Sequence, residues 1–440
     1  MKQTQSRRIL IVGAGVAGIS AAVECIRRGH TPVLLEAKPY IGGRARSFTD
    51  TATGDTIDNG QHVMMGCYHS LLGVLRLLGT DTLLEEQPSL RVAFVDADGR
   101  HDELDASLLP GKAGVALGIL RLKHIGIRAK VKALIFALRV QFNLLDCKAM
   151  TARELLEATG QPPDIITRLW EPLILATLNA TPENAAAVLF VEVLRRAMFG
   201  GGNSSSLLIP RCGLSDLFEP AHGFIASNGG ELHTGTSVAN LLIRNGAVCG
   251  VATEDGRTIE GDTVIVAVPP KYVLRLIAEG YHTHPFFAPL HDYTFSPIVS
   301  LYLWFDRPVM QNDFAALLGT TTQWVFNKTA TDSPNGGHVA LTVSAANPLV
   351  QQSAEDLARH CADELRASFP QARNAVLTGY KVIKEKSATF LATPHLESRR
   401  LCAITPLTGL YLAGDWTATG LPATLEGAAQ SGIAAVAAIG

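Results

Sequence analysis

The chain is most strongly constrained by a glycine-rich unit near its N-terminus, at residues 8–37. Ile9–Val12 is a short apolar run, as expected of a strand buried on both faces, and Gly13, Gly15 and Gly18 then form the pattern G-x-G-x-x-G. In that order, the glycines allow a tight turn, the approach of a pyrophosphate to the backbone, and close packing of helix on strand. The pattern predicts a βαβ nucleotide-binding unit.

The second half of this unit favours the same interpretation. A helix is predicted from Val16, and Thr31–Leu35 is predicted as the next buried strand. Glu36 ends that strand 18 residues after the last glycine of the motif, where an acid can bind a ribose diol. An acid at this place also argues against a 2′-phosphorylated cofactor. The alternative is an ordinary glycine-rich turn in an α/β protein.

Length and composition narrow the class of protein. The chain has 440 residues, enough for two or three domains, and a net charge of −2, which gives no argument for nucleic-acid binding. Its seven cysteines are scattered and form no C-x-x-C pair, which predicts reduced thiols in the cytoplasm and no metal site. Glycines interrupt the N-terminal apolar run, so no signal peptide is expected, and no apolar stretch is long enough for a spanning helix.

Two later loops carry polar groups suited to a nucleotide. In K-P-Y-I-G-G-R-A-R, the flexible pair Gly42 and Gly43 precedes Arg44, whose guanidinium group suits a pyrophosphate. The alternative for this loop is a solvated basic surface. In I-D-N-G-Q-H-V, Asp58 is suited to capping a turn, and chemistry alone leaves His62 open between a functional group and a hydrogen-bonded core histidine.

These motifs together resemble the flavin amine oxidase and phytoene desaturase superfamily. The C-terminal run Y-L-A-G-D-W-T-A-T-G-L-P-A-T-L-E-G resembles it too. In that superfamily an acid after glycine meets the ribityl–phosphate region, and the next helix points its N-terminus at the flavin ring. The resemblance implies FAD as the cofactor. It implies that Gly414 and Asp415 are the glycine and acid at the ribityl–phosphate region, and that Thr424 and Leu425 form the helix N-terminus at the flavin ring.

The resemblance also implies the fold and the cofactor contacts. The expected class is α/β, with a Rossmann-type, glutathione-reductase-like FAD-binding domain at 1–80, 205–275 and 400–440. A discontinuous α+β substrate domain fills 81–204 and 276–399. The residues implied to bind FAD are Gly13, Gly15, Val16, Ala17, Gly18, Glu36, Ala37, Gly42, Gly43, Arg44, Ala45, Gly60, Gln61, His62, Val238, Gly414, Asp415, Thr424 and Leu425.

Finer matches, among them D-N-G-Q-H-V-M-M-G-C-Y and W-E-P-L-I-L-A-T-L-N, resemble the hydroxysqualene dehydroxylases of hopanoid biosynthesis. This branch implies a long apolar isoprenoid substrate, hydroxysqualene, reduced to squalene. An acid would protonate the allylic hydroxyl, and reduced FAD would deliver a hydride. The candidate acids are His62, by its flavin-side motif, and Glu171, by its apolar setting. A carboxylate in such a setting is more often a paired structural acid, and this is the alternative for Glu171.

Three alternatives share this fold. A carotenoid-type desaturase would run the same chemistry oxidatively. An amine oxidase is less favoured, because the lysine of that branch has no counterpart in Ser296–Phe305. The Rab escort and dissociation-inhibitor proteins bind prenylated partners without catalysis, but the intact Gly414-Asp415 pair and G-G-R favour a bound flavin. The sequence names neither an electron donor nor an oligomeric state.

A basic stretch lies between residues 106 and 145. It contains no Asp or Glu, and apolar residues fill the gaps between seven basic side chains: Lys112, Arg121, Lys123, Arg128, Lys130, Lys132 and Arg139. A basic amphipathic helical segment at 112–140 is typical of proteins on anionic membrane surfaces. We therefore expect peripheral association with the inner face of the cell membrane; the alternative is a solvated basic face of the substrate domain.

Several local signals predict the remaining elements. Leu90–Leu104 is predicted as a hairpin, Thr151 and Glu154 as a capping box, and 236–270 as a β-meander turning at Asn245-Gly246 and Asp255-Gly256. Further on, the predicted elements are the strands Thr263–Val268, Ile298–Phe305, Gln323–Phe326, His338–Ser344 and Val376–Ile383 and a helix near Ala354–Ser368.

Overall fold

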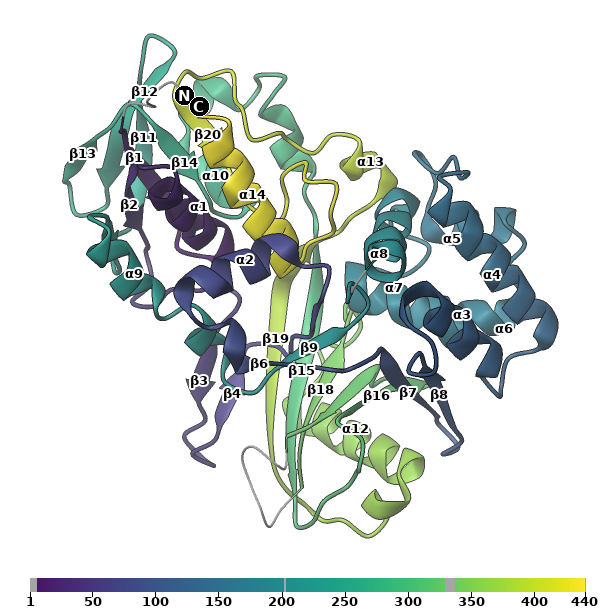
Figure 1. Cartoon of the computed structure of the whole chain (residues 1–440). Helices are drawn as coiled ribbons and strands as arrows, with labels where there is room; N and C mark the ends of the chain where they lie inside the picture. The colour runs from purple at the N-terminus through teal and green to yellow at the C-terminus, as the bar shows by residue number, and fades with distance from the viewer. Residues whose placement is uncertain (1–5, 202, 329–336, 440) are drawn as a thin grey trace.

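The computed structural model describes residues 6–201, 203–328 and 337–439. The predicted nucleotide unit lies in a five-stranded parallel sheet with the order β10-β2-β1-β14-β20 (Figure 1). Its strands are β1 (Arg8–Val12), β2 (Thr31–Leu35), β10 (Glu231–His233), β14 (Val264–Val266) and β20 (Leu410–Leu412). The strands predicted at 9–12 and 31–35 are confirmed, whereas the apolar run 263–268 forms only the three-residue β14.

Two helices from opposite ends of the chain pack together beside this sheet. They are α1 (Val16–Arg27) and α14 (Leu425–Ala437). Their backbones approach closely at Gly432, where a Cβ atom would lie 2.1 Å from the carbonyl oxygen of Ala17. The nearby helices α2 (His69–Leu78) and α9 (Ala221–Ser227) pack on α14 and α1, respectively.

The predicted meander is confirmed as a three-stranded antiparallel sheet. It consists of β11 (Val238–Arg244), β12 (Ala247–Thr253) and β13 (Thr258–Glu260). Asn245 and Gly246 have φ angles of 50° and 75°, as a two-residue hairpin turn with both central residues left-handed requires. The next helix, α10 (Pro270–Leu276), follows the parallel strand β14.

A seven-stranded sheet forms the second large layer, with the order β19-β15-β18-β17-β16-β7-β8. Its strands are β7 (Arg91–Asp96), β8 (His101–Asp105), β15 (Phe295–Phe305), β16 (Phe314–Leu318), β17 (Trp324–Asn327), β18 (Gly337–Val343) and β19 (Leu377–Phe390). The hairpin predicted at Leu90–Leu104 is confirmed as β7 and β8, and the predicted helix is confirmed as α12 (Ala354–Ser368). β19 runs to Phe390, beyond its predicted end at Ile383, because it pairs with nearly the whole of β15.

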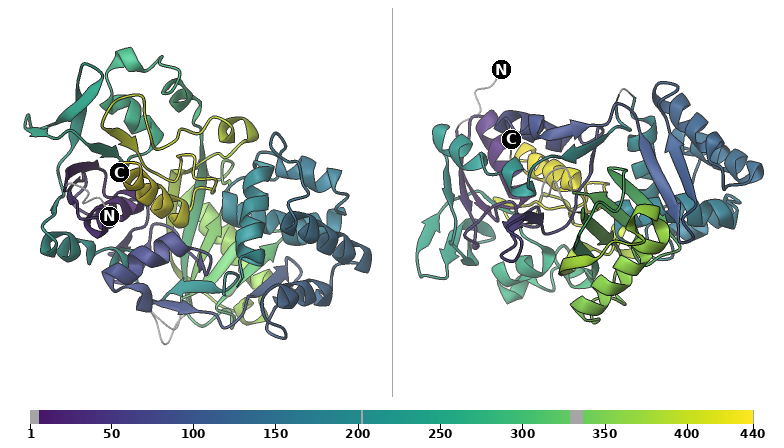
Figure 2. Two further views of the ribbon diagram at one scale, coloured as in Figure 1. Left: turned by 45° about the horizontal axis from the view of Figure 1, so that its top comes forward. Right: turned by 90° about the horizontal axis from the view of Figure 1, so that it is seen from below.

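A helical layer lies at the end of the molecule away from the parallel sheet, as both views of Figure 2 show. Its helices are α3 (Gly111–Arg121), α4 (Ile127–Gln141), α5 (Ala152–Ala158), α6 (Pro163–Ile165), α7 (Glu171–Leu178) and α8 (Ala187–Phe199). Phe136, Trp170 and Phe190 pack together between these helices. The capping box of Thr151 and Glu154 is confirmed at the start of α5.

The predicted basic segment forms two helices rather than one. The chain breaks after Arg121 because the carboxylate of Asp102 accepts hydrogen bonds from the backbone amides of Lys123 (2.7 Å) and His124 (3.1 Å). Gly126 then takes extended dihedral angles as the N-cap of α4. Among the described residues, no helix is long and apolar enough to cross a membrane.

Shorter elements connect these layers. Two small antiparallel sheets are formed by β3 (Ser47–Thr49) with β4 (Thr56–Asp58), and by β5 (Met64–Met65), β9 (Leu207–Pro210) and β6 (Leu84–Glu86). The remaining short helices are η1 (Asp81–Leu83), η2 (Ile166–Trp170), η3 (Leu214–Leu217), η4 (Glu279–Tyr281), η5 (Ala288–Asp292), η6 (Pro370–Ala372) and α13 (Pro394–Glu397).

Candidate FAD site

The glycine motif forms the turn between β1 and α1. Gly13 has a φ of +103°, and a Cβ there would lie 2.7 Å from the carbonyl oxygen of Ala267. A Cβ on Gly18 would lie 1.8 Å from the carbonyl oxygen of Gly13, in agreement with its expected packing role. A Cβ on Gly15, by contrast, would meet no atom within 4 Å. The space above Gly15 is therefore open to a ligand.

The N-terminus of α1 is free to bind an anion. Gly15 is its N-cap and offers no side chain, and its first turn contains no acidic residue. Val16 and Ala17 are buried as the first two helical residues. The unbonded amides and the positive end of the helix dipole are the groups that hold pyrophosphate in dinucleotide-binding folds.

Glu36 is fixed at the end of β2. Its carboxylate accepts hydrogen bonds from the backbone amides of Ala14 (2.7 Å) and Lys38 (2.8 Å). The amide of Thr236 donates to the carbonyl oxygen of Glu36 (2.8 Å), and two residues later Val238 begins β11. Val238 therefore lies near the same sheet edge as Glu36. Ala37, the residue after Glu36, is exposed.

The G-G-R loop lies directly against the glycine motif. Gly42 forms a β-bridge with Gly15, and a Cβ on Gly43 would lie 3.1 Å from the Cα atom of Gly15. Both glycines have positive φ angles, and Ala45 is buried behind them. Two motifs recognised separately in the sequence are thus one structural unit.

Arg44 forms an ion pair with both carboxylate oxygens of Asp415. Its Nη2 atom donates to both carboxylate oxygens, at 2.8 and 2.7 Å, and its Nη1 atom donates to the carbonyl oxygen of Ala388 at 2.6 Å. The side chain of Asp415 is only 7% exposed, whereas that of Arg44 is 41% exposed. Asp415 follows β20 directly after Gly414, so this ion pair joins the G-G-R loop to the C-terminal motif.

The segment Gly60–His62 lies beside β15. A Cβ on Gly60 would lie 3.4 Å from the hydroxyl oxygen of Ser300, and the buried side-chain oxygen of Gln61 has no hydrogen-bond partner. The Nδ1 atom of His62 lies 2.6 Å from the carbonyl oxygen of Gly60. Because a carbonyl only accepts, Nδ1 carries the proton and Nε2 is left as an acceptor. Burial lowers the pKa of His62, so the neutral imidazole is favoured.

The C-terminal helix α14 has Thr424 as its N-cap. Its hydroxyl oxygen accepts the amide of Gly427 (3.1 Å), and Leu425 is the first helical residue. A pocket opens beside this N-terminus, between the parallel-sheet layer and the helices α7 and α8. We call it the Thr424 pocket; its lining residues are Met65, Cys67, Tyr68, Thr177, Val193, Arg196, Ala197, Leu421, Pro422, Thr424 and Glu426.

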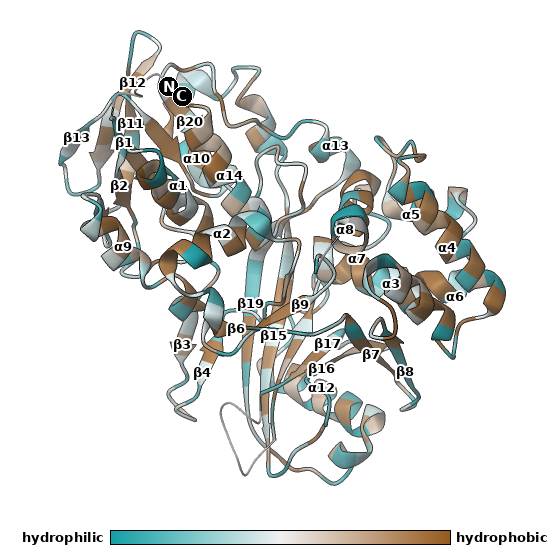
Figure 3. Cartoon of the chain, viewed as in Figure 1, coloured by the Kyte–Doolittle hydropathy of each residue, from teal (hydrophilic) through white to brown (hydrophobic). Residues whose placement is uncertain are grey.

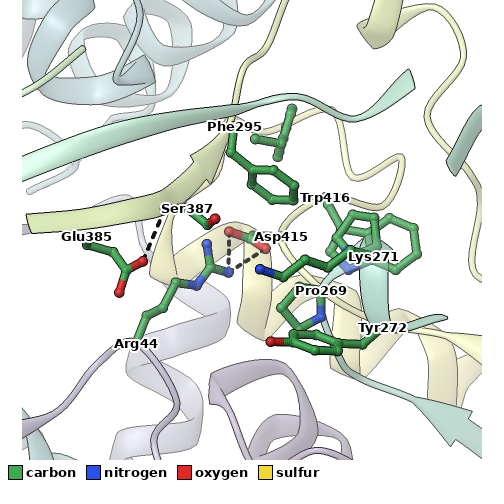
Figure 4. A pocket seen from close by; sticks show the side chains of 11 residues that line it. Arg44, Pro269, Lys271, Tyr272, Phe295, Glu385, Ser387, Asp415 and Trp416 are labelled. Carbon is green, nitrogen blue, oxygen red and sulfur yellow. Dashed lines mark hydrogen bonds and ion pairs between the residues drawn. The ribbon is translucent and has the colours of Figure 1, made fainter. Parts of the chain in front are cut away.

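A second pocket surrounds the ion pair of Arg44 and Asp415 (Figure 4). We call it the Arg44 pocket; its lining residues are Arg44, Pro269, Pro270, Lys271, Tyr272, Phe295, Glu385, Ser387, Phe390, Asp415 and Trp416. Figure 4 shows the side chain of Lys271 extending toward Arg44 and Asp415 between Tyr272 and Trp416.

Most residues of the Arg44 pocket were not predicted from the sequence. Lys271 and Tyr272 follow β14, and ligands of open parallel sheets bind outside the carboxyl ends of the strands, so this rule was an available signal. Glu385 had no such signal. It lies on β19 opposite Ile298 of β15, and that register depends on tertiary pairing.

Arg400 was also missed, although it supports the loop after Asp415. Its side chain is fully buried and donates to the carbonyl oxygens of Asp415 (2.8 Å), Leu421 (2.8 Å) and Thr417. It also pairs with Glu397 at 2.9 Å. One guanidinium group thus fixes the backbone between β20 and α14.

Glu171 lies apart from these groups. It begins α7 and is half-buried, and it lines neither the Arg44 pocket nor the Thr424 pocket. Burial raises the pKa of its carboxyl group, while Arg153 opposes this shift and Glu183 adds to it. Arg153 and Glu183 form an ion pair of 2.8 Å in which Glu183 is 54% exposed. The two candidate acids are therefore not brought together.

The observed groups fit a flavin dinucleotide. The open space at Gly15 and the free N-terminus of α1 suit a pyrophosphate, and the carboxylate of Glu36 suits a ribose diol. The buried, unpartnered oxygen of Gln61 calls for a hydrogen-bond donor. These features define the class of the protein as a dinucleotide-binding protein with a parallel, Rossmann-type sheet.

The comparison with protein families makes the class specific. Residues 16–440 match the family of flavin containing amine oxidoreductases, so the chain belongs to that family and is an FAD-dependent oxidoreductase. A solved oxidoreductase from Methanosarcina mazei has the same fold, with a TM-score of 0.76, 18% identity and coverage of 98% and 99% of the two chains. The predicted fold class and cofactor are confirmed.

Individual relatives agree with the branch that the sequence motifs resemble. The chain is 30% identical to hydroxysqualene dehydroxylase from Rhodopseudomonas palustris, over 97% of each protein. It is 25% identical to 15-cis-phytoene desaturase from Glycine max, over 96% of this chain and 78% of that protein. The match to enzymes of this kind rules against the non-catalytic, prenyl-binding alternative.

Proposed function

We propose that this enzyme reduces hydroxysqualene to squalene. The observation that carries the proposal is the similarity to a hydroxysqualene dehydroxylase from end to end, together with an apolar pocket beside the N-terminus of α14. In the reaction an allylic C–O bond is replaced by a C–H bond, and the hydroxyl leaves as water once it gains a proton. FAD, when bound and reduced, supplies the hydride.

The Thr424 pocket is the proposed place for part of the isoprenoid chain. Five of its lining residues are apolar: Met65, Val193, Ala197, Leu421 and Pro422. The pocket is lined by residues of the parallel-sheet layer and of the helical layer, and sites between two layers are common. An apolar lining excludes water, which would otherwise capture an allylic cation.

The two candidates for the proton donor are His62 and Glu171, and we favour His62. Neither residue lines the Arg44 pocket or the Thr424 pocket. The charges of Asp58 and of Arg44, a residue of the candidate FAD site, act on the pKa of His62, whereas the charges of Arg153 and Glu183 act on the pKa of Glu171. Because Nδ1 donates to Gly60, His62 delivers a proton only from a protonated Nε2.

This geometry gives the proposed acid a pH signature. Since burial lowers the pKa of His62, little imidazolium is present at pH 7, and its fraction grows as the pH falls. The single-turnover rate of pre-reduced enzyme should therefore rise as the pH is lowered from 8 toward 6. A rate that is flat or rises with pH would contradict His62 as the donor.

Substitution tests the same assignment. Reduced His62→Ala and Glu171→Gln enzymes are mixed with hydroxysqualene without oxygen, and flavin reoxidation is followed through one turnover. Loss of the true donor should slow this step by roughly 10²–10⁴-fold while the flavin spectrum stays normal. We expect this for His62→Ala. If both variants reoxidise at the wild-type rate, neither residue is the donor and the proton comes from another group or from water.

The reaction itself is tested by product analysis. Anaerobic incubation of the reduced enzyme with hydroxysqualene should give squalene, and the oxidised enzyme should leave phytoene unchanged. The similarity to a phytoene desaturase keeps a carotenoid-type desaturase as the second candidate. Desaturated phytoene without squalene formation would establish that candidate instead. An amine oxidase is less favoured, since β15 carries no lysine.

The proposed location is the cytoplasm, with peripheral association at the inner face of the cell membrane. Its support is the basic, acid-free stretch of α3 and α4 and the expected lipid substrate. A C30 substrate is far more soluble in a bilayer than in water, so an enzyme held at the bilayer surface meets it at a higher concentration.

A further inference from the structure

Large apolar side chains are exposed in one part of the molecule. Nine of the fourteen such side chains in the described part of the chain lie between residues 108 and 144. These nine are Leu108, Leu109, Leu120, Ile127, Val131, Ile135, Leu138, Phe142 and Leu144. Single exposed apolar residues are ordinary, but a concentration of this kind marks an interaction surface.

The helix α4 carries most of this surface and is apolar on two opposite sides. One stripe packs into the protein and is formed by Ala129, Ala133, Phe136 and Val140. The other stripe is exposed by 44–68% and is formed by Ile127, Val131, Ile135, Leu138 and Phe142. Both stripes follow the three- and four-residue spacing of one helix face. Only the first is needed to hold α4 on its neighbours.

The exposed stripe is flanked by basic residues. At 100° per residue, Arg128, Lys132 and Arg139 lie along one side of it and Lys130 along the other. Arg128 and Arg139 are exposed and take part in no ion pair within the described ranges. Lys130 differs, because its ammonium group donates to the carbonyl oxygen of Leu120 at 3.0 Å.

This combination decides between two possible occupants of the surface. A second copy of the chain would bring the same patch onto itself in a two-fold dimer, so that basic residues would face basic residues. A bilayer with anionic lipids matches both features, because acyl chains take up the apolar stripe and headgroups pair with the flanking cations.

We propose that the exposed face of α4, continued by Leu120 of α3 and by Leu144, is a membrane-docking face for anionic bilayers. In this arrangement α4 lies parallel to the bilayer plane, with Ile135, Leu138 and Phe142 below the headgroups. The inference names the surface through which the proposed peripheral association occurs. Figure 1 shows α4 at the outer edge of the molecule, and Figure 3 shows apolar and polar stretches along it.

Docking through α4 would hold the Thr424 pocket near the bilayer. The helix α8 packs on both α3 and α4. Val193, Arg196 and Ala197 of the same helix line the pocket. One helix thus separates the proposed membrane surface from the proposed substrate pocket, which makes a lipid route between them short. This step alone rests on the proposed function.

Vesicle binding of the FAD-loaded enzyme tests the proposal. The vesicles are phosphatidylcholine alone or with phosphatidylglycerol, and they contain no substrate, so the outcome is independent of the reaction. The apolar-stripe variant is Ile135→Gln, Leu138→Gln and Phe142→Gln; the charge variant is Arg128→Gln and Arg139→Gln. Matched controls are Val376→Gln with Ile404→Gln and Arg359→Gln with Arg373→Gln, all exposed and outside the patch.

Wild-type enzyme and both controls should bind the anionic vesicles equally. The charge variant should bind about 30-fold more weakly, as expected for two lost cations. The apolar-stripe variant should lose on the order of 100-fold or more in affinity on both vesicle types. All variants should keep wild-type turnover of detergent-dispersed substrate if the proposed function holds.

Two results would overturn the docking face. One is wild-type binding by the apolar-stripe variant. The other is a wild-type dimer in solution that the same variant converts to a monomer without any vesicle effect, which would assign the surface to a second copy. Loss of turnover with normal vesicle binding would count against the proposed reaction and leave the docking face intact.

Discussion

Arg44 and Asp415 are the residue pair on which the candidate site depends most. The sequence motifs assign Arg44 to the pyrophosphate, yet in the structure its guanidinium group donates hydrogen bonds to both carboxylate oxygens of Asp415. These two roles are compatible only if the exposed part of Arg44 reaches the cofactor while Asp415 is held. They predict different outcomes when the two residues are changed together.

A double-mutant cycle separates the roles. Arg44→Ala and Asp415→Asn should each weaken FAD binding, and the apparent Kd is measured by flavin fluorescence during reconstitution. If Arg44 contacts phosphate directly, Arg44→Ala should still cost about tenfold or more in the Asp415→Asn background. An added cost close to zero there would mean that Arg44 acts only by positioning Asp415.

Arg400 is expected to be a stability residue rather than a ligand. Arg400→Leu would leave Glu397 and several carbonyl oxygens buried without their donor, at a cost of about 3–5 kcal/mol in the free energy of unfolding. The adjacent Arg399→Leu, which breaks a partly exposed ion pair with Asp292 and an exposed hydrogen bond to His395, should cost less than about 1 kcal/mol. Urea denaturation compares the two, and equal losses would contradict the role given to Arg400.

At the level of elements, the site depends on how closely α1 and α14 approach. Gly432→Ala places a Cβ atom against the backbone oxygen of Ala17, so the two helices must move apart. We expect a loss of about 1–3 kcal/mol, as for other overpacked cores. Gly73→Ala in α2 is the matched control, because no atom lies within 4 Å of its Cβ position.

The control should even be slightly stabilising, by about 0.5–1 kcal/mol, because alanine is the better helix former. Thermal unfolding followed by circular dichroism measures both variants. A Gly432→Ala protein as stable as wild type would mean that the helix contact is looser than the structure has it. Such a result would also mean that the contact between α1 and α14 does not require a glycine at position 432.

At the level of the whole molecule, FAD is expected to act as part of the fold. Its proposed contacts come from residues near both ends of the chain and from its middle, so a bound cofactor should raise the Tm of the enzyme by mass action. Apoenzyme and reconstituted enzyme are compared by calorimetry, and Tm should rise with the FAD concentration.

Gly15→Val supplies the control for this effect. The Cβ position of Gly15 is empty, so the variant apoenzyme should unfold at the wild-type temperature, yet the added side chain occupies the proposed pyrophosphate space. FAD should therefore fail to raise its Tm. A normal FAD-dependent increase in this variant would show that the pyrophosphate lies elsewhere.

The local units of this protein could be predicted from the amino-acid sequence alone. Hydrogen-bond geometry and glycine dihedral angles are decided within a few residues, so the β1–α1–β2 unit, the turn at Asn245 and Gly246, and the capping box of Thr151 and Glu154 were all predictable. The resemblance of the motifs added the family and FAD, which the comparison with known proteins confirms.

Which distant residues meet became clear only from the packed molecule. The placement of Glu385 depends on the register of β19 against β15, and the ion pair of Arg44 with Asp415 joins residues far apart in the chain. The same holds for α4: its two apolar stripes look alike in the sequence, and only packing against neighbouring helices shows which one is buried. Local propensity acts over one or two turns, whereas long-range contacts follow from how whole layers pack.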